Sequence, residues 1–337
     1  MLGSHSDTVP DGGRFDGVAG VVIALEVARI LADRGITLRH DLAVADFLAE
    51  EVSIFGVSCI GSRAMAGVLP ADWLDRQSGE RDLRQALRDV GGDPQALGGK
   101  LATDLCAFLE LHIEQGQVLE REGTNLGLVT AIVGITRVEI IVTGRPDHAG
   151  TTPMGARADA LVTAARIVQQ IERQAKGMTR QGRHFTATVG EFEIAPNAAN
   201  VVPAHVRMLV DIRAEAAEDM QAFLQWIDGL SVAPGGDAVA VAARRISAND
   251  PVQLDQGLVG ALAQSAQALG VSHRRMVSGA GHDAAFMARL CPAAMVFVPC
   301  LGGRSHCPEE WAETNDLMLA AEVLADTVFS IDREDEI

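Results

Sequence analysis

Histidines and acidic residues that could bind metal ions occur at several places along this chain. His5 and Asp16 lie in its glycine-rich opening segment, MLGSHSDTVPDGGRFDG. The other candidates, further along, are Glu50, Glu51, His112 and His306. Two imidazoles and a carboxylate are a common ligand set for zinc, and a bridging aspartate is enough to add a second ion. These residue types therefore favour a centre of one or two divalent metal ions.

These side chains would meet if each of them follows a strand of one α/β sheet. The two glutamates close the apolar stretch DLAVADFLA, His112 stands in the segment LELHIEQG, and His306 follows AAMVFVPC. Ligand sites in open α/β sheets gather at the carboxyl ends of the strands. We therefore expect the side chains to converge there. Asp7, two residues after His5, is expected to accept a hydrogen bond from a ligating imidazole.

Each candidate also has an ordinary structural explanation. A single histidine is more often a plain polar residue than a metal ligand, and two adjacent glutamates usually lie on a solvated surface. Here, however, the glutamate pair Glu50 and Glu51 closes a strand of apolar residues, which is an unusual place for a solvated pair. The joint arrangement, and not any single residue, favours the metal site.

The order of the predicted elements indicates an α/β protein with two domains. The segment GVAGVVIALEVARILADRG has apolar residues at helical spacing and a stop at Gly35, and DLAVADFLAEE is typical of a strand inside a parallel sheet. Residues 133–246 follow the pattern β-α-β-β-α-β of a ferredoxin-like unit. We predict a catalytic domain of residues 1–132 and 247–337 with a mixed sheet covered on both faces. The inserted small domain would mediate dimerisation.

Composition excludes several functional classes. The net charge of −17 over 337 residues disfavours nucleic acid or an anionic membrane as a partner, because a polyanion would be repelled. The sequence has no apolar run of membrane-spanning length and no signal-peptide pattern at its start. The 5 cysteines form no CxxC pair, which favours a reducing compartment. We expect a cytoplasmic enzyme.

Several sequence blocks occur in the order typical of one hydrolase family. They are GSHSDTVPDGGRFDGVAG, AEEVSIFG, ELHIEQG, GRPDHAGTTPM, PNAANVVP, DIR, SGAGHDA and SHCPEEW. Together they resemble the amidase/hydantoinase/carbamoylase family of the aminoacylase-type zinc hydrolases, over essentially the whole chain. The pairing of HAGTTPM with ELHIEQG is the most specific part. The resemblance implies hydrolysis of the carbamoyl or ureido C–N bond of N-carbamoyl-L-amino acids or a related ureido carboxylate, with allantoate as the alternative substrate.

The resemblance also implies how the metal ligands are divided. Asp16 matches a carboxylate that bridges two divalent ions, zinc or manganese, with cobalt or nickel as further possibilities. His5 and His112 match the other ligands of one ion. Glu51 and His306 match those of the second ion. The resemblance thus implies a hydrolase with two metal ions.

The same resemblance implies catalytic and substrate-binding residues. Glu50 matches the general base, and His148 matches a small-domain histidine that reaches into the site of the neighbouring subunit of a homodimer. The implied substrate-binding residues are Gln115, Asn200, Arg213, Gly279 and Gly281. Without the resemblance, His148 could be a turn residue, Asn200 a strand cap and Arg213 a surface ion-pair partner. We expect His282 to order its loop and Cys307 to pack, with no metal bound by either.

Two features depart from the family pattern. Many members have Glu-Glu-Gly-Ser-Arg-Phe where this chain has EEVSIF, so an arginine is lost and the substrate preference stays open. Members also carry several dozen residues before the GSH motif, whereas only Met1 and Leu2 precede Gly3 here. We therefore expect the strand that delivers His5 to be mostly missing and the chain to be N-terminally truncated, with poor stability or weak activity. A catalytically impaired binding protein and an aminoacylase or dipeptidase of the wider clan are the alternatives.

Overall fold

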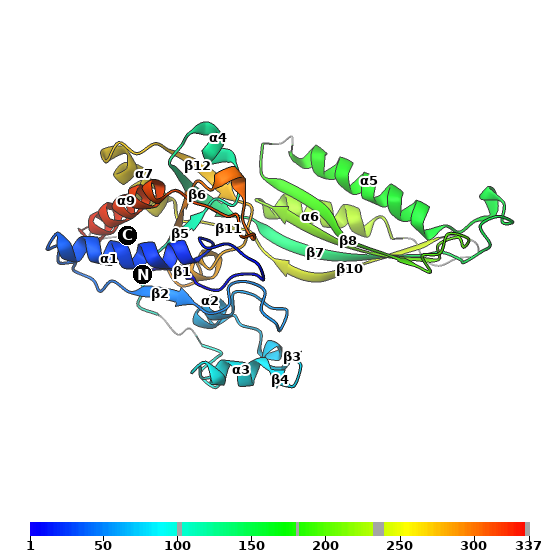
Figure 1. Cartoon of the computed structure of the whole chain (residues 1–337), viewed down its shortest axis with the longest axis horizontal. Helices are drawn as coiled ribbons and strands as arrows, with labels where there is room; N and C mark the ends of the chain where they lie inside the picture. Colours follow the sequence, from blue (N-terminus) through cyan, green and yellow to red (C-terminus); the bar gives the residue numbers. More distant parts are fainter. Residues whose placement is uncertain (100–102, 180–181, 232–238, 334–337) are drawn as a thin grey trace. The chain divides into compact units, whose positions relative to one another are not determined.

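The computed structural model describes residues 1–99, 103–179, 182–231 and 239–333 (Figure 1). These residues form two compact units. The first unit comprises Met1–Ala131, Gln253–Ser278 and His282–Ile337, and the second comprises Ile132–Val252 with Gly279–Gly281. Within the described residues, no helix combines the length and the apolar character needed to cross a membrane.

The first unit contains a 7-stranded sheet in the order β11-β6-β13-β5-β1-β2, with β12 paired to β6. Strands β13, β5, β1 and β2 run parallel, and β6 is antiparallel to β13. The strands are β1 (Leu2–His5), β2 (Val44–Phe47), β5 (Phe108–Ile113), β6 (Leu126–Ile132), β11 (Val252–Gln253), β12 (His273–Ser278) and β13 (Ala293–Val298). A separate hairpin joins β3 (Gln77–Ser78) to β4 (Arg81–Asp82). The fold is therefore mixed α/β, as the pattern of elements predicted.

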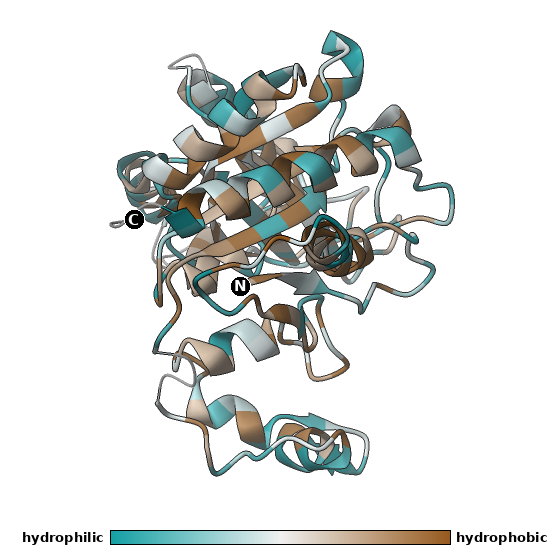
Figure 2. Cartoon of the chain, turned by 90° about the vertical axis from the view of Figure 1, so that its left-hand side faces the viewer, coloured by the Kyte–Doolittle hydropathy of each residue, from teal (hydrophilic) through white to brown (hydrophobic). Residues whose placement is uncertain are grey.

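Three longer helices of this unit pack against one another on the sheet: α1 (Val18–Asp33), α7 (Gln256–Ala268) and α9 (Thr314–Arg333). Their apolar sides share one core with alternate residues of the central strands, such as Leu109 and Leu111 of β5. Figure 2 shows apolar and polar residues mixed along the helices of the chain. The shorter helices are α2 (Ile60–Met65), η1 (Ala71–Asp75), α3 (Leu83–Asp89), α4 (Val118–Glu122), α8 (Ala284–Met287) and η3 (Leu301–Gly303). Because side chains alternate along a strand, His112 points to the face opposite this core.

Strand β1 corrects the expectation that the strand carrying His5 is mostly missing. Residues Leu2–His5 pair in parallel with Val44–Phe47 of β2 on one side, and Leu2 is paired with β5 on the other. A short strand is held in place here because it has a hydrogen-bonded neighbour on each side. Gly3 permits the close approach of β2, since a Cβ atom at this position would lie 2.5 Å from the Ala45 carbonyl oxygen.

Strand β2 is shorter and less buried than its apolar sequence predicts. Only Val44–Phe47 forms a strand, and it lies at the end of the sheet order. Val44 and Ala45 are half-buried and Asp46 is exposed. An apolar run predicts burial, but it does not reveal that a strand has a neighbour on one side only.

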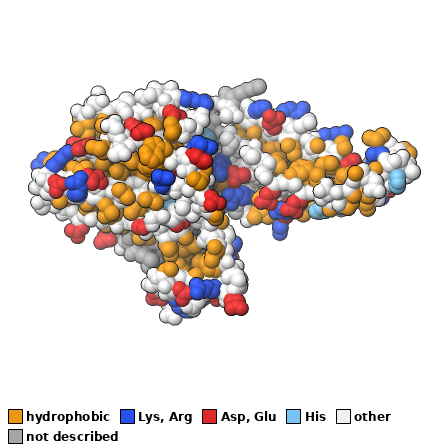
Figure 3. All heavy atoms as spheres, viewed as in Figure 1, with side chains coloured by type: hydrophobic (Ala, Val, Ile, Leu, Met, Phe, Trp, Pro, Cys, Tyr) orange, Lys and Arg blue, Asp and Glu red, His pale blue; other side chains and the backbone are white. Residues whose placement is uncertain are grey.

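The second unit has the element order β7-α5-β8-β9-α6-β10 and a 4-stranded antiparallel sheet in the order β10-β7-β9-β8. The elements are β7 (Gly134–Thr143), η2 (Met154–Ala156), α5 (Ala160–Thr179), β8 (Phe185–Ala195), β9 (His205–Ala214), α6 (Ala217–Asp228) and β10 (Ala240–Asn249). Alternate apolar residues of the sheet form a core with α5 and α6. Other residues of the sheet form ion pairs, such as Glu139 with Arg207 and Arg244. Figure 3 shows acidic and basic side chains interspersed over the visible face of the molecule.

Asp332 ties the end of α9 to the segment before β2, and its loss is expected to destabilise the protein. Its carboxylate accepts hydrogen bonds from the backbone N–H groups of Arg39, at 2.8 Å, and His40, at 3.0 Å, and lies 3.0 Å from the His40 ring nitrogen. Burial alone would raise the pKa of Asp332, but these hydrogen bonds lower it below its ordinary value. Asp332→Asn should reduce the free energy of unfolding at pH 7 by about 2 kcal/mol.

This difference is expected to depend on pH. Because the folded-state pKa of Asp332 is depressed, the stabilisation is present above the ordinary pKa of a carboxyl group and is lost as the pH falls through the folded-state value. Urea unfolding of the wild type and the variant should therefore converge in acid. The exposed neighbour Asp41 supplies the control variant Asp41→Asn. A constant difference between pH 7 and strongly acidic solution would contradict the explanation.

Candidate metal centre

Asp16 is placed by the turn that begins α1. The next residue, Gly17, has a positive φ of 66°, which glycine adopts without steric cost. A Cβ atom at Gly17 would lie 2.4 Å from Nε2 of His5, so no side chain fits there. The glycine therefore allows the loop to pass directly against the imidazole, and Asp16 is only 2% exposed.

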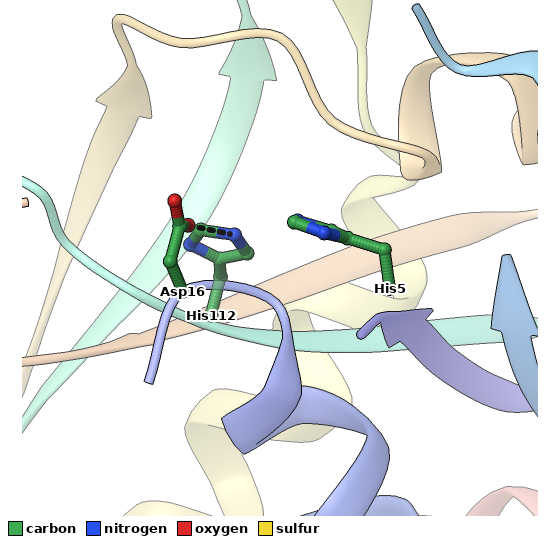
Figure 4. A group of neighbouring side chains, drawn as sticks. All are labelled: His5, Asp16 and His112. Carbon is green, nitrogen blue, oxygen red and sulfur yellow. Dashed lines mark ion pairs between the residues drawn. The ribbon is translucent and has the colours of Figure 1, made fainter. Parts of the chain in front are cut away.

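His5, Asp16 and His112 form the first of two groups of candidate metal ligands, and all three are buried. They come from the end of β1, the loop before α1 and strand β5. Nε2 of His112 lies 3.1 Å from Oδ1 of Asp16, and the ring of His5 points toward this pair from the other side (Figure 4). The ligand atoms of the group lie within 4.8 Å of one another.

Backbone carbonyl groups determine which nitrogen each buried imidazole presents to the centre. Nδ1 of His5 lies 2.9 Å from the Asp7 carbonyl oxygen, and Nδ1 of His112 lies 2.9 Å from that of Ile113. A carbonyl oxygen can only accept, so each Nδ1 carries the proton and donates. When either ring loses its second proton to become neutral, Nε2 is the nitrogen that becomes available to a metal ion.

Asp16, Glu51 and His306 form the second group. Nε2 of His306 lies 3.0 Å from Oδ2 of Asp16 and 2.9 Å from Oε1 of Glu51. The His306 side chain is 47% exposed, whereas Glu51 is only 14% exposed. Asp16 therefore contributes one oxygen to each group, and the second group lies nearer to solvent.

The chemistry of these donors fits two divalent cations. Oδ2 of Asp16 is buried, and apart from its ion-pair contact with Nε2 of His306 at 3.0 Å it has no hydrogen-bond partner among the described residues. Burial would raise the pKa of Asp16, but its hydrogen bond to His112 and the nearby charges of His112, His5 and His306 lower it well below its ordinary range. An ionised carboxylate that is this deeply buried is costly unless positive charge compensates it, and divalent cations would supply that charge. The donor set suits zinc or manganese.

The side-chain carboxylate of Asp7 lies closer to the backbone of Glu50 and Glu51 than to the ring of His5. Its carboxylate accepts hydrogen bonds from the backbone N–H groups of Glu50 and Glu51, both at 3.1 Å. The same carboxylate lies 3.5 Å from Nδ1 of His5, farther away than the Asp7 carbonyl oxygen. Asp7 therefore accepts the hydrogen bond from His5, as expected, and does so through its backbone carbonyl oxygen.

Glu50 lies between the first group and the buried thiol of Cys59. Its Oε2 is 3.7 Å from Nε2 of His5, and the Cys59 thiol donates to Oε1 at 3.4 Å. Burial raises the pKa of Glu50 to about 7; the negative charges of Glu110 and Glu51 add to this shift, and the histidines oppose it. A carboxyl group with a pKa near neutrality is suited to take up and release a proton.

Comparison with known proteins identifies the family. The family model described as Peptidase family M20/M25/M40 matches residues 1–330. The chain belongs to this family. An N-carbamoyl-L-amino-acid amidohydrolase of Paenarthrobacter aurescens is 41% identical over 340 residues, which cover 98% of this chain and 81% of the relative. The allantoate amidohydrolase of Bacillus subtilis is 35% identical over 337 residues, with coverages of 98% and 80%.

A solved structure has the same fold as this M20 chain. It is described as an amidase of the hydantoinase/carbamoylase family from Burkholderia multivorans. The TM-score is 0.87 at 37% sequence identity, and the match covers 99% of this chain and 81% of that one. At this identity and coverage, the similarity extends over both units of the chain.

One buried carboxylate of this M20 chain, Glu110 of β5, lies two residues before His112 and was not among the predicted site residues. Glu110 is fully buried and accepts hydrogen bonds from the Ser4 hydroxyl and the Ala284 N–H group, both at 2.9 Å. Burial raises the pKa of Glu110 above its ordinary value. The sequence could have revealed Glu110. Residues two apart on a strand point to the same face, so Glu110 points to the same face of β5 as His112.

His282 and Cys307 belong to neither group of candidate ligands among the described residues. The ring of His282 is buried, its Nε2 lies 2.8 Å from the Ser278 hydroxyl oxygen, and its centroid is 4.6 Å from that of His112. Burial and the neighbouring His112 lower the pKa of His282 well below its ordinary value, so the ring is neutral. His282 therefore packs against a candidate ligand without being one.

The expected substrate-binding residues lie in both units. In the first unit, the amide of Gln115 donates to Oδ1 of Asp16 at 3.1 Å. In the second unit, Arg213 donates from Nε to Asp211 at 2.8 Å and from Nη1 to the Gly279 carbonyl oxygen at 2.7 Å. Gly281 belongs to the same turn as Gly279 and to the same unit. The structure therefore joins Arg213 to the glycine turn of the SGAGHDA motif.

His148 and Asn200 come together in the second unit. The Ala149 N–H group donates to the Asn200 carbonyl oxygen at 3.0 Å, next to a bridge between His148 and Val201. Nδ1 of His148 accepts hydrogen bonds from the N–H groups of Gly150 and Thr151 at 3.0 and 3.2 Å. The proton of the ring is therefore on Nε2, and this exposed histidine presents an N–H donor.

Proposed function

We propose that this protein hydrolyses the carbamoyl C–N bond of N-carbamoyl-L-amino acids. The observation that carries the proposal is the position of Asp16, which belongs to both candidate ligand groups, close to His5 and its neighbour Glu50. The names of the relatives support this substrate class, and the identity to the N-carbamoyl-L-amino-acid amidohydrolase exceeds that to the allantoate amidohydrolase. A catalytically inert binding protein would not need this assembled centre.

Two divalent ions, zinc or manganese, are the proposed cofactors, with cobalt or nickel as alternatives. His5, Asp16 and His112 would hold one ion, and Glu51 and His306 would share Asp16 to hold the other. When bound, such ions polarise a carbonyl group and increase the acidity of a water molecule. The chain supplies the groups that orient the substrate and move the proton.

Glu50 is the proposed general base. Its carboxylate takes a proton from the attacking water and delivers it to the nitrogen that leaves when the C–N bond breaks. One water is added in total, and the products are the amino acid and a carbamate that decomposes to carbon dioxide and ammonia. The N–H group of His148 would donate to the carbonyl oxygen as negative charge develops on it.

The remaining proposals concern the substrate carboxylate and the assembly. Arg213 and Asn200 would hold the carboxylate, and Gln115, Gly279 and Gly281 would line the same pocket. Arg213 suits this role because its guanidinium is oriented by Asp211 and by a backbone carbonyl group. The small domain, residues 133–246, would form a homodimer in which His148 serves the neighbouring subunit. A cytoplasmic location fits five free cysteines.

The test is an assay of the metal-loaded protein on a panel of ureido compounds. The panel contains N-carbamoyl-L-amino acids, their D-enantiomers, N-carbamoyl-β-alanine, allantoate and ureidoglycolate, and ammonia and free amino acid are both followed. Release of amino acid from the carbamoyl substrates is the expected result. Ammonia from allantoate alone would assign the protein to allantoate instead. An absence of turnover with metal bound would contradict the proposal.

Arg213→Met is expected to weaken binding of the substrate and to leave the chemical step largely intact. Two charge-assisted hydrogen bonds to the carboxylate are worth about 3 kcal/mol, which corresponds to a KM about 100-fold higher. Steady-state kinetics would measure KM and kcat separately. Arg244→Met is the matched control, because Arg244 lies in the same sheet, on strand β10, and pairs with Glu139. An unchanged KM would show that Arg213 does not hold the carboxylate.

A further inference from the structure

Glu310 is a buried carboxylate that contacts the loop of Asp16 from a distant part of the chain. It lies in the segment between β13 and α9 and is 1% exposed. Its Oε1 accepts two backbone hydrogen bonds, from Phe15 at 2.9 Å and from Asp16 itself at 3.0 Å. The backbone of the shared candidate ligand is therefore attached to this one side chain.

The second carboxylate oxygen of Glu310 continues the network to the side chain of Asp16. Oε2 accepts a hydrogen bond from the Ser305 hydroxyl at 2.8 Å. The Gln115 amide donates both to the Ser305 hydroxyl oxygen and to Oδ1 of Asp16, each at 3.1 Å. The hydrogen bonds thus form a closed ring from the backbone of Asp16 through Glu310, Ser305 and Gln115 back to its carboxylate.

This ring determines the position of residues in both candidate ligand groups. Asp16 belongs to both, and Ser305 directly precedes His306, a ligand of the second. The loop also lies tightly against the carboxylate, since a Cβ atom at Gly13 would be 2.0 Å from Oε1 of Glu310. Movement of Glu310 would therefore displace Asp16 and release Ser305 at the same time.

We propose that Glu310 is a positioning residue that orients Asp16 and His306 for metal binding. The inference rests on the proposed function, because it assumes that the two groups hold divalent ions. Glu310 contacts no candidate ligand atom and acts through Ser305, Gln115 and the backbone of Asp16. Residues of this kind, which orient metal ligands from behind, typically change metal affinity by about 10–100-fold when they are replaced.

The first experiment measures metal affinity directly. Full-length protein is stripped with a chelator and titrated with Mn²⁺ in a calorimeter. Glu310→Ala is expected to weaken binding by at least about tenfold. Glu310→Gln should stay within about threefold of the wild type, because its amide oxygen still accepts and its NH₂ group donates to Ser305. The matched control is Glu309→Ala, which removes an exposed neighbour 3.9 Å from Arg304.

A purely structural role would give a different result. The melting temperature of the chelated protein would then fall in Glu310→Ala while the affinity for Mn²⁺ stayed within about threefold of the wild type, and this outcome would overturn the inference. An equal loss in Glu310→Gln and Glu310→Ala would also overturn it, because these hydrogen bonds would then not be the cause.

Gly13→Ala tests the same contact from the opposite side and remains informative if Glu310→Ala does not fold. The added methyl group must displace Oε1 of Glu310, so Mn²⁺ affinity should fall, whereas unchanged affinity would contradict the inference. The double variant Gly13→Ala/Glu310→Ala should bind Mn²⁺ as tightly as Glu310→Ala alone, because the carboxylate that clashes with the added methyl group has been removed. A wild-type protein that binds no divalent ion would instead refute the proposed function.

Discussion

Glu50→Gln is expected to lower kcat for the ureido substrate by about 1,000-fold while the bound metal content stays unchanged. Glutamine has nearly the same size as glutamate, but it cannot take a proton from water or deliver one to the leaving nitrogen. The buried Glu50 side chain has a pKa of about 7, which suits this transfer near neutral pH. Steady-state kinetics of the purified variant, combined with elemental analysis of bound metal, would measure the two quantities separately.

The control for this experiment is a glutamate with the same chemistry outside the centre. Glu309 is exposed, so Glu309→Gln should leave both kcat and metal content at wild-type values. If Glu50→Gln lost its metal together with its activity, Glu50 would be a ligand and not the base. A variant that kept most of the wild-type kcat would exclude Glu50 from proton transfer altogether.

Asp16→Asn is expected to reduce binding at both metal sites, because Asp16 contributes an oxygen to each group. The affinity for Mn²⁺ should fall by more than roughly 100-fold, which is the upper range for replacing a residue that only orients a metal ligand. Activity should fall to the background. Titration of the stripped protein with Mn²⁺ and analysis of retained metal would show the effect. Asp46→Asn is the control, since Asp46 is exposed on β2 and accepts from Ser6.

The same variant makes a second prediction for the chelated protein. Without metal, the buried carboxylate of Asp16 lies 3.1 Å from Nε2 of His112 and 3.0 Å from Nε2 of His306, and these histidines lower its pKa, so its ionised form stabilises the folded state. The melting temperature of chelated Asp16→Asn at neutral pH should therefore fall below that of the chelated wild type. Loss of one ion with full retention of the other would contradict the shared role of Asp16.

Local patterns in the sequence were sufficient for part of the fold and the centre. The helix that ends at Gly35 was predicted from its apolar spacing, and the structure confirms α1 with Gly35 directly after its cap, at φ 64°. The ends of apolar strands also predicted where His112 and the other candidate ligands would gather, and the structure brings them together. Both predictions depend on periodicity and on the ends of elements, which neighbouring residues along the chain encode.

Other features depended on residues that are far apart in the sequence. The position of β1 depends on its pairing with β2 and β5, and β2 lies at the end of the sheet formed by the described strands, beside β1. The contact of Glu310 with Asp16 joins residues 294 positions apart. The pKa of Glu50 depends on burial by segments distant in the chain. The sequence by itself thus determined which residue types stand at the ends of the strands. Only the tertiary structure decided their partners and charges, because hydrogen bonding and desolvation act between atoms that are close in space.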